Sequence, residues 1–353
     1  MATPSAPSLR VGLIGYGLAG SVFHAPLITV TPGLSLAAVV TANDERRAQA
    51  QREHPGVEVV DQVEQLWSLD LDLVVVASPN RLHAVHATAA LEAGAAVVVD
   101  KPLAVSAAEA KELAGVAEQR GLVLSVFQNR RWDGDFLTVS SLVRAGKLGP
   151  VHRFESRFER WRPQLKGGWR ELSDPAEAGG ILYDLGSHLV DQALTLFGPV
   201  TEVYAEVDRL RTDAQADDDA FVALRHAAGT RSHLWMSALA GNLGPRFRVL
   251  GSESAYVCHG LDGQESALRA GRTPSDAGWG VTRPAGYGLL GTGEDAVPFP
   301  TEHGAYQRYY EGIAGALRGR APVPVEAGDA IAALTVLEAA RLSAIEQRVV
   351  SLA

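Results

Sequence analysis

A glycine-rich turn follows the first apolar segment of the chain, and it constrains the fold more than any other feature. Residues 11–14 are apolar, the turn reads Gly15-Tyr16-Gly17-Leu18-Ala19-Gly20, and a helical stretch comes next. In a strand–turn–helix unit, the first glycine allows the tight turn and the second lets backbone approach a pyrophosphate, while the third lets helix and strand pack closely. The free N–H groups at the start of the helix attract phosphates. Residues 15–20 therefore predict a dinucleotide-binding unit.

Four more short apolar segments follow within the first 127 residues. They are residues 35–41, 71–77, 96–100 and 123–127, with helical stretches such as 82–93 and 107–120 between them. Continuous apolar strands that alternate with helices indicate a parallel sheet covered on both faces. We therefore expect an α/β fold that begins with a doubly wound Rossmann sheet over residues 9–127. A disordered tail over residues 1–8 should precede it, because these residues are small and Pro-rich.

The pattern changes after residue 127, where polar and apolar residues alternate along longer segments. Examples are residues 153–159, 203–210, 220–225 and 233–236. Alternation of this kind is typical of an open antiparallel sheet with one packed face. We expect residues 128–353 to form an α+β domain with a largely antiparallel open sheet.

Two later segments of this second domain stand apart from the alternating strands. Residues 262–302 are rich in Gly, Pro, Thr and Ser and read as an excursion or flap. The last segment, residues 327–347, predicts an amphipathic helix, and one candidate position for it is against the first domain.

Length and charge limit the class of protein. The 353 residues are about twice a typical domain, which favours two domains. The net charge of -9 argues against nucleic acid or an anionic membrane as the main partner. The N-terminus lacks the apolar core of a signal peptide and no apolar run reaches the ~18 residues of a membrane span, so we expect a cytoplasmic protein. The single cysteine, Cys258, excludes an intrachain disulfide and a cysteine metal cluster.

The residues after the second strand bear on the choice of cofactor. An acidic residue there would bind the ribose 2′-hydroxyl and select NAD, but this chain has Thr41 about twenty residues past the turn. Arg46 and Arg47 lie within reach of a 2′-phosphate. Two other interpretations remain open: the arginines begin a solvated helix, or Asp44 accepts the ribose hydrogen bond. We favour NADP, with NAD possible.

Two further clusters carry acid–base chemistry. Asp100-Lys101-Pro102 ends the fourth strand, where ligands of open α/β sheets bind. The run 181–197 predicts one helix, so that Asp184 and His188 share a face four residues apart. A histidine beside a carboxylate can transfer protons near neutral pH, although a structural Asp–His pair is the alternative. Gly186 inside this helix suggests that something approaches its backbone closely. Asp184, His188 and Asp191 also offer metal ligands, but hydride transfer needs no metal and we expect none.

Together these motifs resemble the Gfo/Idh/MocA family of oxidoreductases. The matching features are the glycine turn, Ser78-Pro79-Asn80 with His83, Asp100-Lys101-Pro102 and the run 179–191, in the family's order over almost the whole chain. The family triplet is usually Glu-Lys-Pro, and Asp100 departs from it while keeping the lysine. Residues 23–26 and 129–136 are similar to those of NADP-type scyllo-inositol dehydrogenases.

The resemblance implies a set of site residues and partners. Lys101, Asp184 and His188 would form the catalytic set, and Asn129, Arg130, Trp161 and Trp169 are further candidates for substrate contacts. Residues expected at the cofactor are Gly15, Tyr16, Gly17, Leu18, Ala19, Gly20, Thr41, Arg46, Ser78, Pro79, Asn80, His83, Lys101 and Pro102. Family substrates are mostly sugars and cyclic polyols, and the broad sheet face commonly forms homodimers or homotetramers.

The function we expect is hydride transfer between a secondary alcohol of an inositol-like polyol or sugar and nicotinamide. His188 would act as the base, Asp184 would orient it, and Lys101 would donate a hydrogen bond to the reacting oxygen. Three alternatives stay open: a non-catalytic dinucleotide-binding regulator, an NAD-dependent glycosidase, and a reductase for a sugar ketone or another carbonyl.

Overall fold

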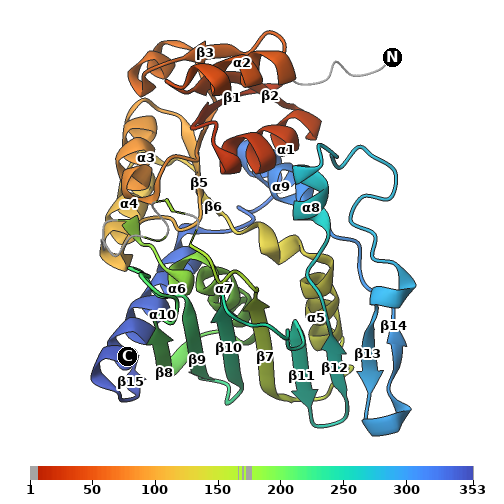
Figure 1. Cartoon of the computed structure of the whole chain (residues 1–353). Coiled ribbons are helices and arrows are strands. Elements are labelled where there is room, and N and C mark those ends of the chain that lie inside the picture. The colour runs from red at the N-terminus through yellow and green to blue at the C-terminus, as the bar shows by residue number, and fades with distance from the viewer. Residues whose placement is uncertain (1–6, 166, 169–170, 172–176, 353) are drawn as a thin grey trace.

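The computed structural model describes residues 7–165, 167–168, 171 and 177–352. Most of the expected tail over residues 1–8 and the predicted substrate residue Trp169 therefore lie outside the described residues. The described chain forms two sheets, one above the other in Figure 1, with helices around each. None of the helices among the described residues is both long and apolar enough to cross a membrane.

The first sheet has six strands in the order β3-β2-β1-β4-β5-β6, and every neighbouring pair is parallel. The strands are β1 (Leu9–Ile14), β2 (Leu34–Val40), β3 (Glu58–Val60), β4 (Leu73–Val76), β5 (Ala96–Asp100) and β6 (Leu124–Phe127). This is the doubly wound order of a dinucleotide-binding sheet, in which ligands lie at the carboxyl ends of the strands. The predicted parallel Rossmann sheet is confirmed, and β3 is an additional strand at its edge.

Helices cover the first sheet because its strands are apolar on both faces. They are η1 (Ala19–His24), α1 (Ala25–Val30), α2 (Asp44–Glu53), η2 (Val63–Ser68), η3 (Asn80–Leu82), α3 (His83–Glu92) and α4 (Ala107–Arg120). Two of them begin with the side-chain caps that helix ends favour. Asn43 accepts a hydrogen bond from Arg46 N at 3.0 Å, and Ser106 accepts one from Glu109 N at 3.2 Å.

The second sheet has nine strands in the order β14-β13-β12-β11-β7-β10-β9-β8-β15. The pair β7–β10 is parallel and the others are antiparallel, so the predicted largely antiparallel sheet is confirmed. The strands are β7 (Val151–Glu159), β8 (Val200–Asp208), β9 (Asp219–His226), β10 (Arg231–Ser237), β11 (Phe247–Gly251), β12 (Ala255–Cys258), β13 (Gly288–Gly291), β14 (Val297–Phe299) and β15 (Val350–Ser351).

Most of the remaining helices lie against one face of this sheet or between the two sheets (Figure 1), and the short one at residues 293–295 lies in the turn between β13 and β14. They are η4 (Asn129–Trp132), α5 (Gly134–Arg144), α6 (Ile181–Asp184), α7 (Gly186–Phe197), α8 (Gln264–Arg269), η7 (Pro284–Gly286), η8 (Gly293–Asp295), α9 (Gln307–Leu317) and α10 (Ala327–Glu346). Helix α10 contacts α4 of the first layer as well as α7 and β8 of the second. Ala107 N donates to Glu338 Oε1 at 2.7 Å across the first of these contacts.

The structure changes two expectations about the second domain. The run 181–197 is two helices, α6 and α7, which meet at Leu185. A Cβ on Gly186 would lie 3.4 Å from side-chain atoms of Leu182 and Leu337, so it is helix packing that approaches this backbone. Residues 262–302 are also more regular than a flap, because β13 and β14 form a hairpin that extends the sheet.

Candidate active site

The glycine turn joins β1 to η1 and leaves no space for side chains at two of its positions. Gly15 has a φ of +98°, and a Cβ there would lie 2.6 Å from Ala77 O of the neighbouring strand connection. A Cβ on Gly20 would overlap Gly15 O. The nearest heavy atom to a Cβ on Gly17 is Arg46 Nη1 at 3.8 Å, so this backbone is open. The turn thus offers an exposed backbone at Gly17, and its residues fit the cradle of a dinucleotide pyrophosphate.

The other residues predicted in the turn differ in exposure and in side-chain contacts. Leu18 is 44% exposed and lines the cleft beside Ala19. Tyr16 is buried, and its hydroxyl donates to Glu53 Oε2 at 2.9 Å. The side chain of Tyr16 therefore anchors the turn to α2, which leaves only its backbone to face a cofactor.

The two neighbouring arginines of α2 have different surroundings. Arg47 forms an ion pair with Asp61, and its Nη1 donates to Val59 O at 2.9 Å. Arg46 points its guanidinium to the glycine turn, next to Gly17. Thr41 is buried at the end of β2, and its hydroxyl oxygen accepts from Asn43 N at 3.4 Å. Of the two arginines, Arg46 is therefore the one that lies beside the glycine turn.

The segment after β4 fastens the loops around the cleft. His83 lies between two carbonyls, with Nδ1 2.7 Å from Pro102 O and Nε2 2.9 Å from Ser78 O. Asn80 donates through Nδ2 to Glu177 O at 3.0 Å. These contacts bring Ser78, Asn80, His83 and Pro102 together at the carboxyl ends of β4 and β5, the edge where the sequence predicts the cofactor.

Lys101 reaches from the end of β5 to the second domain. Its Nζ donates to Asp184 Oδ1 at 2.9 Å and to Asp184 O at 2.6 Å. Asp184 ends α6, which Asp217 holds at its start by accepting from Leu182 N at 2.8 Å. The structure therefore joins two of the predicted catalytic residues directly, through an ion pair between the two domains.

His188 lies one turn further on, near the start of α7, and lines the same cavity as Lys101 and Asp184. Its side chain is 5% exposed, and Nδ1 is 3.3 Å from Gln128 Oε1 at the end of β6. Burial lowers the pKa of His188 well below its usual value, and the positive charge of Lys101 lowers this pKa further. The imidazole is therefore neutral near pH 7 and can accept a proton.

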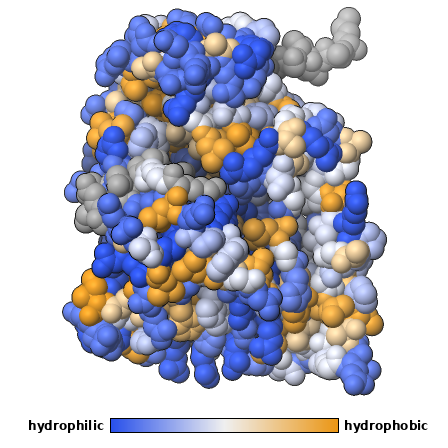
Figure 2. Space-filling view, viewed as in Figure 1, coloured by the Kyte–Doolittle hydropathy of each residue, from blue (hydrophilic) through white to orange (hydrophobic). Residues whose placement is uncertain are grey.

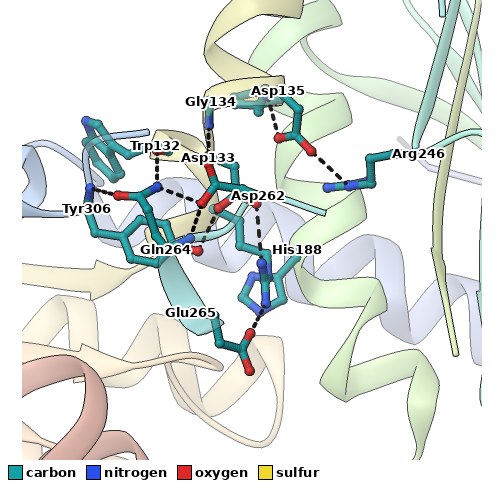
Figure 3. A network of polar contacts seen from close by, with 12 residues as sticks. Trp132, Asp133, Gly134, Asp135, His188, Arg246, Asp262, Gln264, Glu265 and Tyr306 are labelled. Atoms are coloured by element: carbon teal, nitrogen blue, oxygen red, sulfur yellow. Dashed lines mark hydrogen bonds and ion pairs between the residues drawn. The ribbon is translucent and has the colours of Figure 1, made fainter. Parts of the chain in front are cut away.

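A network of buried polar groups supports this region (Figure 3). Tyr306 Oη donates to Asp133 Oδ1 at 2.6 Å, and Arg130 pairs with Asp133 at 3.3 Å and with Glu265 at 2.6 Å. Burial raises the pKa of Asp133 to about 8, and the nearby carboxylates of Asp262 and Asp135 also raise it. This network fixes Arg130 beside His188, and the positive charge of Arg130 also lowers the pKa of His188.

The cavity at these residues has a volume of about 200 Å³ and opens into a neighbouring cavity of about 400 Å³. Its lining includes Leu18 and Ala19 of the turn, the catalytic candidates, and the predicted substrate residues Asn129 and Arg130. Trp161 is 62% exposed and packs over Gly241, so the structure does not bring it into the described lining.

Several residues of the cleft are not predicted by any motif in the sequence. They are Gln128, Arg160, Arg162, Glu265 and Arg269. Only Gln128 carries a signal in the sequence, because it directly follows a strand of the parallel sheet, at the edge where ligands bind. The others come from the ends of elements in the second domain, and tertiary packing alone brings them to the cleft.

Comparison with known proteins decides the family. A model of an oxidoreductase family with an NAD-binding Rossmann fold matches residues 9–128, and the model of its C-terminal alpha/beta domain matches residues 140–352. The chain belongs to the Gfo/Idh/MocA family. It is therefore a family oxidoreductase that uses a nicotinamide cofactor and a small-molecule substrate.

Individual relatives of this family align along nearly the full chain. The chain is 37% identical over 350 residues to the scyllo-inositol 2-dehydrogenase (NADP(+)) IolW of Bacillus subtilis, covering 98% of this chain and 96% of that protein. It is 43% identical over 334 residues to the uncharacterized oxidoreductase YdgJ of Escherichia coli, covering 94% and 95%. The structure of the putative oxidoreductase yvaA from B. subtilis superposes with a TM-score of 0.93 at 37% identity, covering 99% of this chain and 100% of that one.

Proposed function

We propose that the protein is an NADP-dependent dehydrogenase that oxidises a secondary alcohol of a cyclic polyol or sugar, reversibly. The observation that carries this proposal is the meeting of Lys101 and His188 in one cavity beside the glycine turn, although they come from different domains. A hydrogen-bond donor and a neutral base on either side of one small space suit the deprotonation of an alcohol. Relatives whose names specify inositol, glucoside or apiose dehydrogenases support a substrate of this class.

His188 would take the hydroxyl proton. Because the amide oxygen of Gln128 can only accept, Nδ1 carries the ring proton and Nε2 keeps a free lone pair for the substrate. The low pKa of the buried ring keeps it in this basic form. Gln128 thus acts as a positioning residue in the place where the sequence alone suggested Asp184.

Lys101 would donate a hydrogen bond to the developing alkoxide or carbonyl oxygen. Its positive charge stabilises negative charge on that oxygen better when the surroundings exclude water. Asp184 fixes the ammonium through two contacts and is the positioning partner of Lys101. A bound nicotinamide would supply the hydride chemistry at the carbinol carbon in either direction.

The preference for NADP rests on Arg46 and Thr41. Thr41 brings no negative charge to repel a 2′-phosphate, and Arg46 faces the glycine turn without the Asp61 partner that holds Arg47. An arginine can bind a phosphate through two parallel hydrogen bonds. NAD would lack the group that this arginine recognises.

The open face of the nine-stranded sheet is the surface we propose for a homodimer or homotetramer. Leu234 and Met236 of β10 are buried, whereas His233 and Trp235 point to the opposite face. Phe221 of β9 lies across from Trp235, with ring centroids 5.1 Å apart. Half-buried aromatic side chains of this kind are enriched at protein interfaces. On the face shown in Figure 2, hydrophobic residues form small separate patches. We also propose a cytoplasmic location.

A substrate screen tests the proposed function. Purified protein is mixed with NADP or NAD and a panel of inositols and aldoses, and the absorbance of reduced cofactor is followed. The proposal expects turnover of at least one cyclic polyol or sugar, with NADP preferred. Tight NADP binding without turnover of any member of the panel, in either direction, would favour a regulator instead.

A further inference from the structure

Two arginines extend from the end of β7 into the cleft. Beyond Glu159 the chain stays extended, because Arg160 N donates to Ser237 O at 2.8 Å and Arg162 N donates to Ala238 O at 2.7 Å. Alternate residues of an extended chain face the same side. Arg160 and Arg162 therefore both line the two connected cavities, while Trp161 between them faces away and is exposed. The same alternation explains why Trp161, a predicted substrate contact, does not line these cavities.

The other cations around the catalytic candidates already have anionic partners. Lys101 pairs with Asp184, Arg130 pairs with Asp133 and Glu265, and Arg269 pairs with Glu265 at 2.8 Å. Within the part of the chain that the structure describes, the guanidinium groups of Arg160 and Arg162 have no hydrogen bond or ion pair. Among these described residues, two positive charges in the cleft thus lack a paired counter-charge.

The surroundings of Arg160 make this charge costly. Its Cζ lies 4.7 Å from the centroid of the Phe158 ring, and Arg130 and Arg246 lie 4.6 and 5.8 Å from the same centroid. Burial and the neighbouring charge of Arg162 together lower the pKa of Arg160 to about 10, although the carboxylates of Asp184 and Glu265 act in the opposite direction. A partly buried cation that lacks an ion pair of its own gains stability when an anion binds beside it.

We propose that Arg160 and Arg162 bind an oxyanion on the substrate, so that the preferred substrate is an acidic sugar or polyol that carries a carboxylate or a phosphate. The inference rests on the proposed dehydrogenase function and specifies its substrate class. Arginine matches both anions because its planar fork donates two parallel hydrogen bonds. The alcohol to be oxidised then lies toward Lys101 and His188, which line the same cavity as Arg160.

The experiment compares matched sugars and matched arginine variants. Glucose, glucuronate and glucose 6-phosphate are titrated into the NADP-saturated protein by calorimetry, and their turnover is measured in parallel. The variants are Arg160→Gln and, as control, Arg320→Gln, which changes an exposed arginine outside both cavities. Melting temperatures check that both variants fold. Because Leu18 of the glycine turn lines the same cavity as Arg160, this arginine could instead bind the cofactor pyrophosphate. Titration of NADPH, followed by fluorescence, checks this alternative.

The proposal expects at least one acidic sugar to bind about tenfold or more tightly than glucose. Arg160→Gln should remove that advantage, leave glucose and NADPH binding within about threefold, and differ from Arg320→Gln. The glucuronate and phosphate arms decide which oxyanion is preferred. Equal binding of acidic and neutral sugars, or a loss in Arg160→Gln that falls on NADPH instead, would overturn the inference. Arginine-dependent binding without turnover would support this anion site while contradicting the dehydrogenase.

Discussion

Replacing the neighbouring arginines of α2 one at a time separates a cofactor contact from a structural one. The side chains are identical and adjacent in sequence, so each variant is the matched control of the other. Arg46 points to the glycine turn next to Gly17, whereas Arg47 pairs with Asp61 and the carbonyl of Val59. Only Arg46→Ala removes a group that meets the 2′-phosphate in our account.

The expected size follows from the kind of bond that is lost. A hydrogen bond to a charged group contributes about 1.5–3 kcal/mol, which corresponds to roughly 10- to 150-fold in kcat/KM. Arg46→Ala should lower kcat/KM with NADP by that factor and change kcat/KM with NAD by less than about threefold. Arg47→Ala loses an ion pair whose side chains are 28% and 56% exposed, so its effect should be at most about 1 kcal/mol of stability.

Steady-state kinetics with both cofactors, at saturating substrate, measure these factors. Binding of NADPH followed by fluorescence gives a second readout that does not depend on the chemical step. An equal loss with NADP and NAD in Arg46→Ala would contradict the reasoning. A larger loss of NADP preference in Arg47→Ala than in Arg46→Ala would also contradict it.

The pKa of His188 and the packing of the glycine turn give three further predictions. Because the folded-state pKa of His188 is depressed, the neutral base persists as pH falls through the ordinary histidine range, and oxidation should show no acid limb there. In Lys101→Met the loss of the neighbouring positive charge should raise the pKa of His188, so that the fall of residual kcat/KM at acidic pH begins at a higher pH than in the unaltered protein. A pH profile with the fall at the same pH in both proteins would contradict the effect of Lys101 on His188. Folding stability should decrease as pH drops below about 6.5, the unfolded value, because only the unfolded imidazole binds the proton, and His188→Gln should weaken that decrease in acid melts. Gly20→Ala should lower the melting temperature without cofactor because its Cβ overlaps Gly15 O, whereas Gly17→Ala should keep the melting temperature and weaken NADPH binding. A stable Gly20→Ala protein with normal NADPH binding would contradict the packing argument.

The first sheet is predictable because its strands are continuous apolar runs. Every residue of β4, Leu73–Val76, is apolar and buried, and such runs between helices have few other interpretations. Strand β3 escaped because Glu58–Val60 has only three residues and lies at the edge. The hairpin of β13 and β14 escaped because Gly288, Gly291 and Pro298 resemble loop residues in sequence.

The site is predictable only where a local motif carries it. The glycine turn, Lys101 and His188 stand in segments whose spacing is informative by itself. The partner of each residue cannot be predicted from this spacing. Asp184 is close to His188 in the sequence but forms its ion pair with Lys101, and the residue that contacts His188 is Gln128, 60 residues away. Arg160 and Arg162 look like ordinary strand-end charges in the sequence, and only the fold places them in the cleft.

The central claim is that Lys101 and His188 act on one oxygen of the substrate, and a double-mutant cycle on kcat tests it most directly. Each of Lys101→Met and His188→Asn should lower kcat by roughly 10²–10⁴. The double variant should lose much less than the product of the two factors, because groups that act on one atom are non-additive. NADPH binding should stay close to normal in His188→Asn. Near-normal turnover in either single variant, or losses that multiply fully in the double variant, would contradict the account.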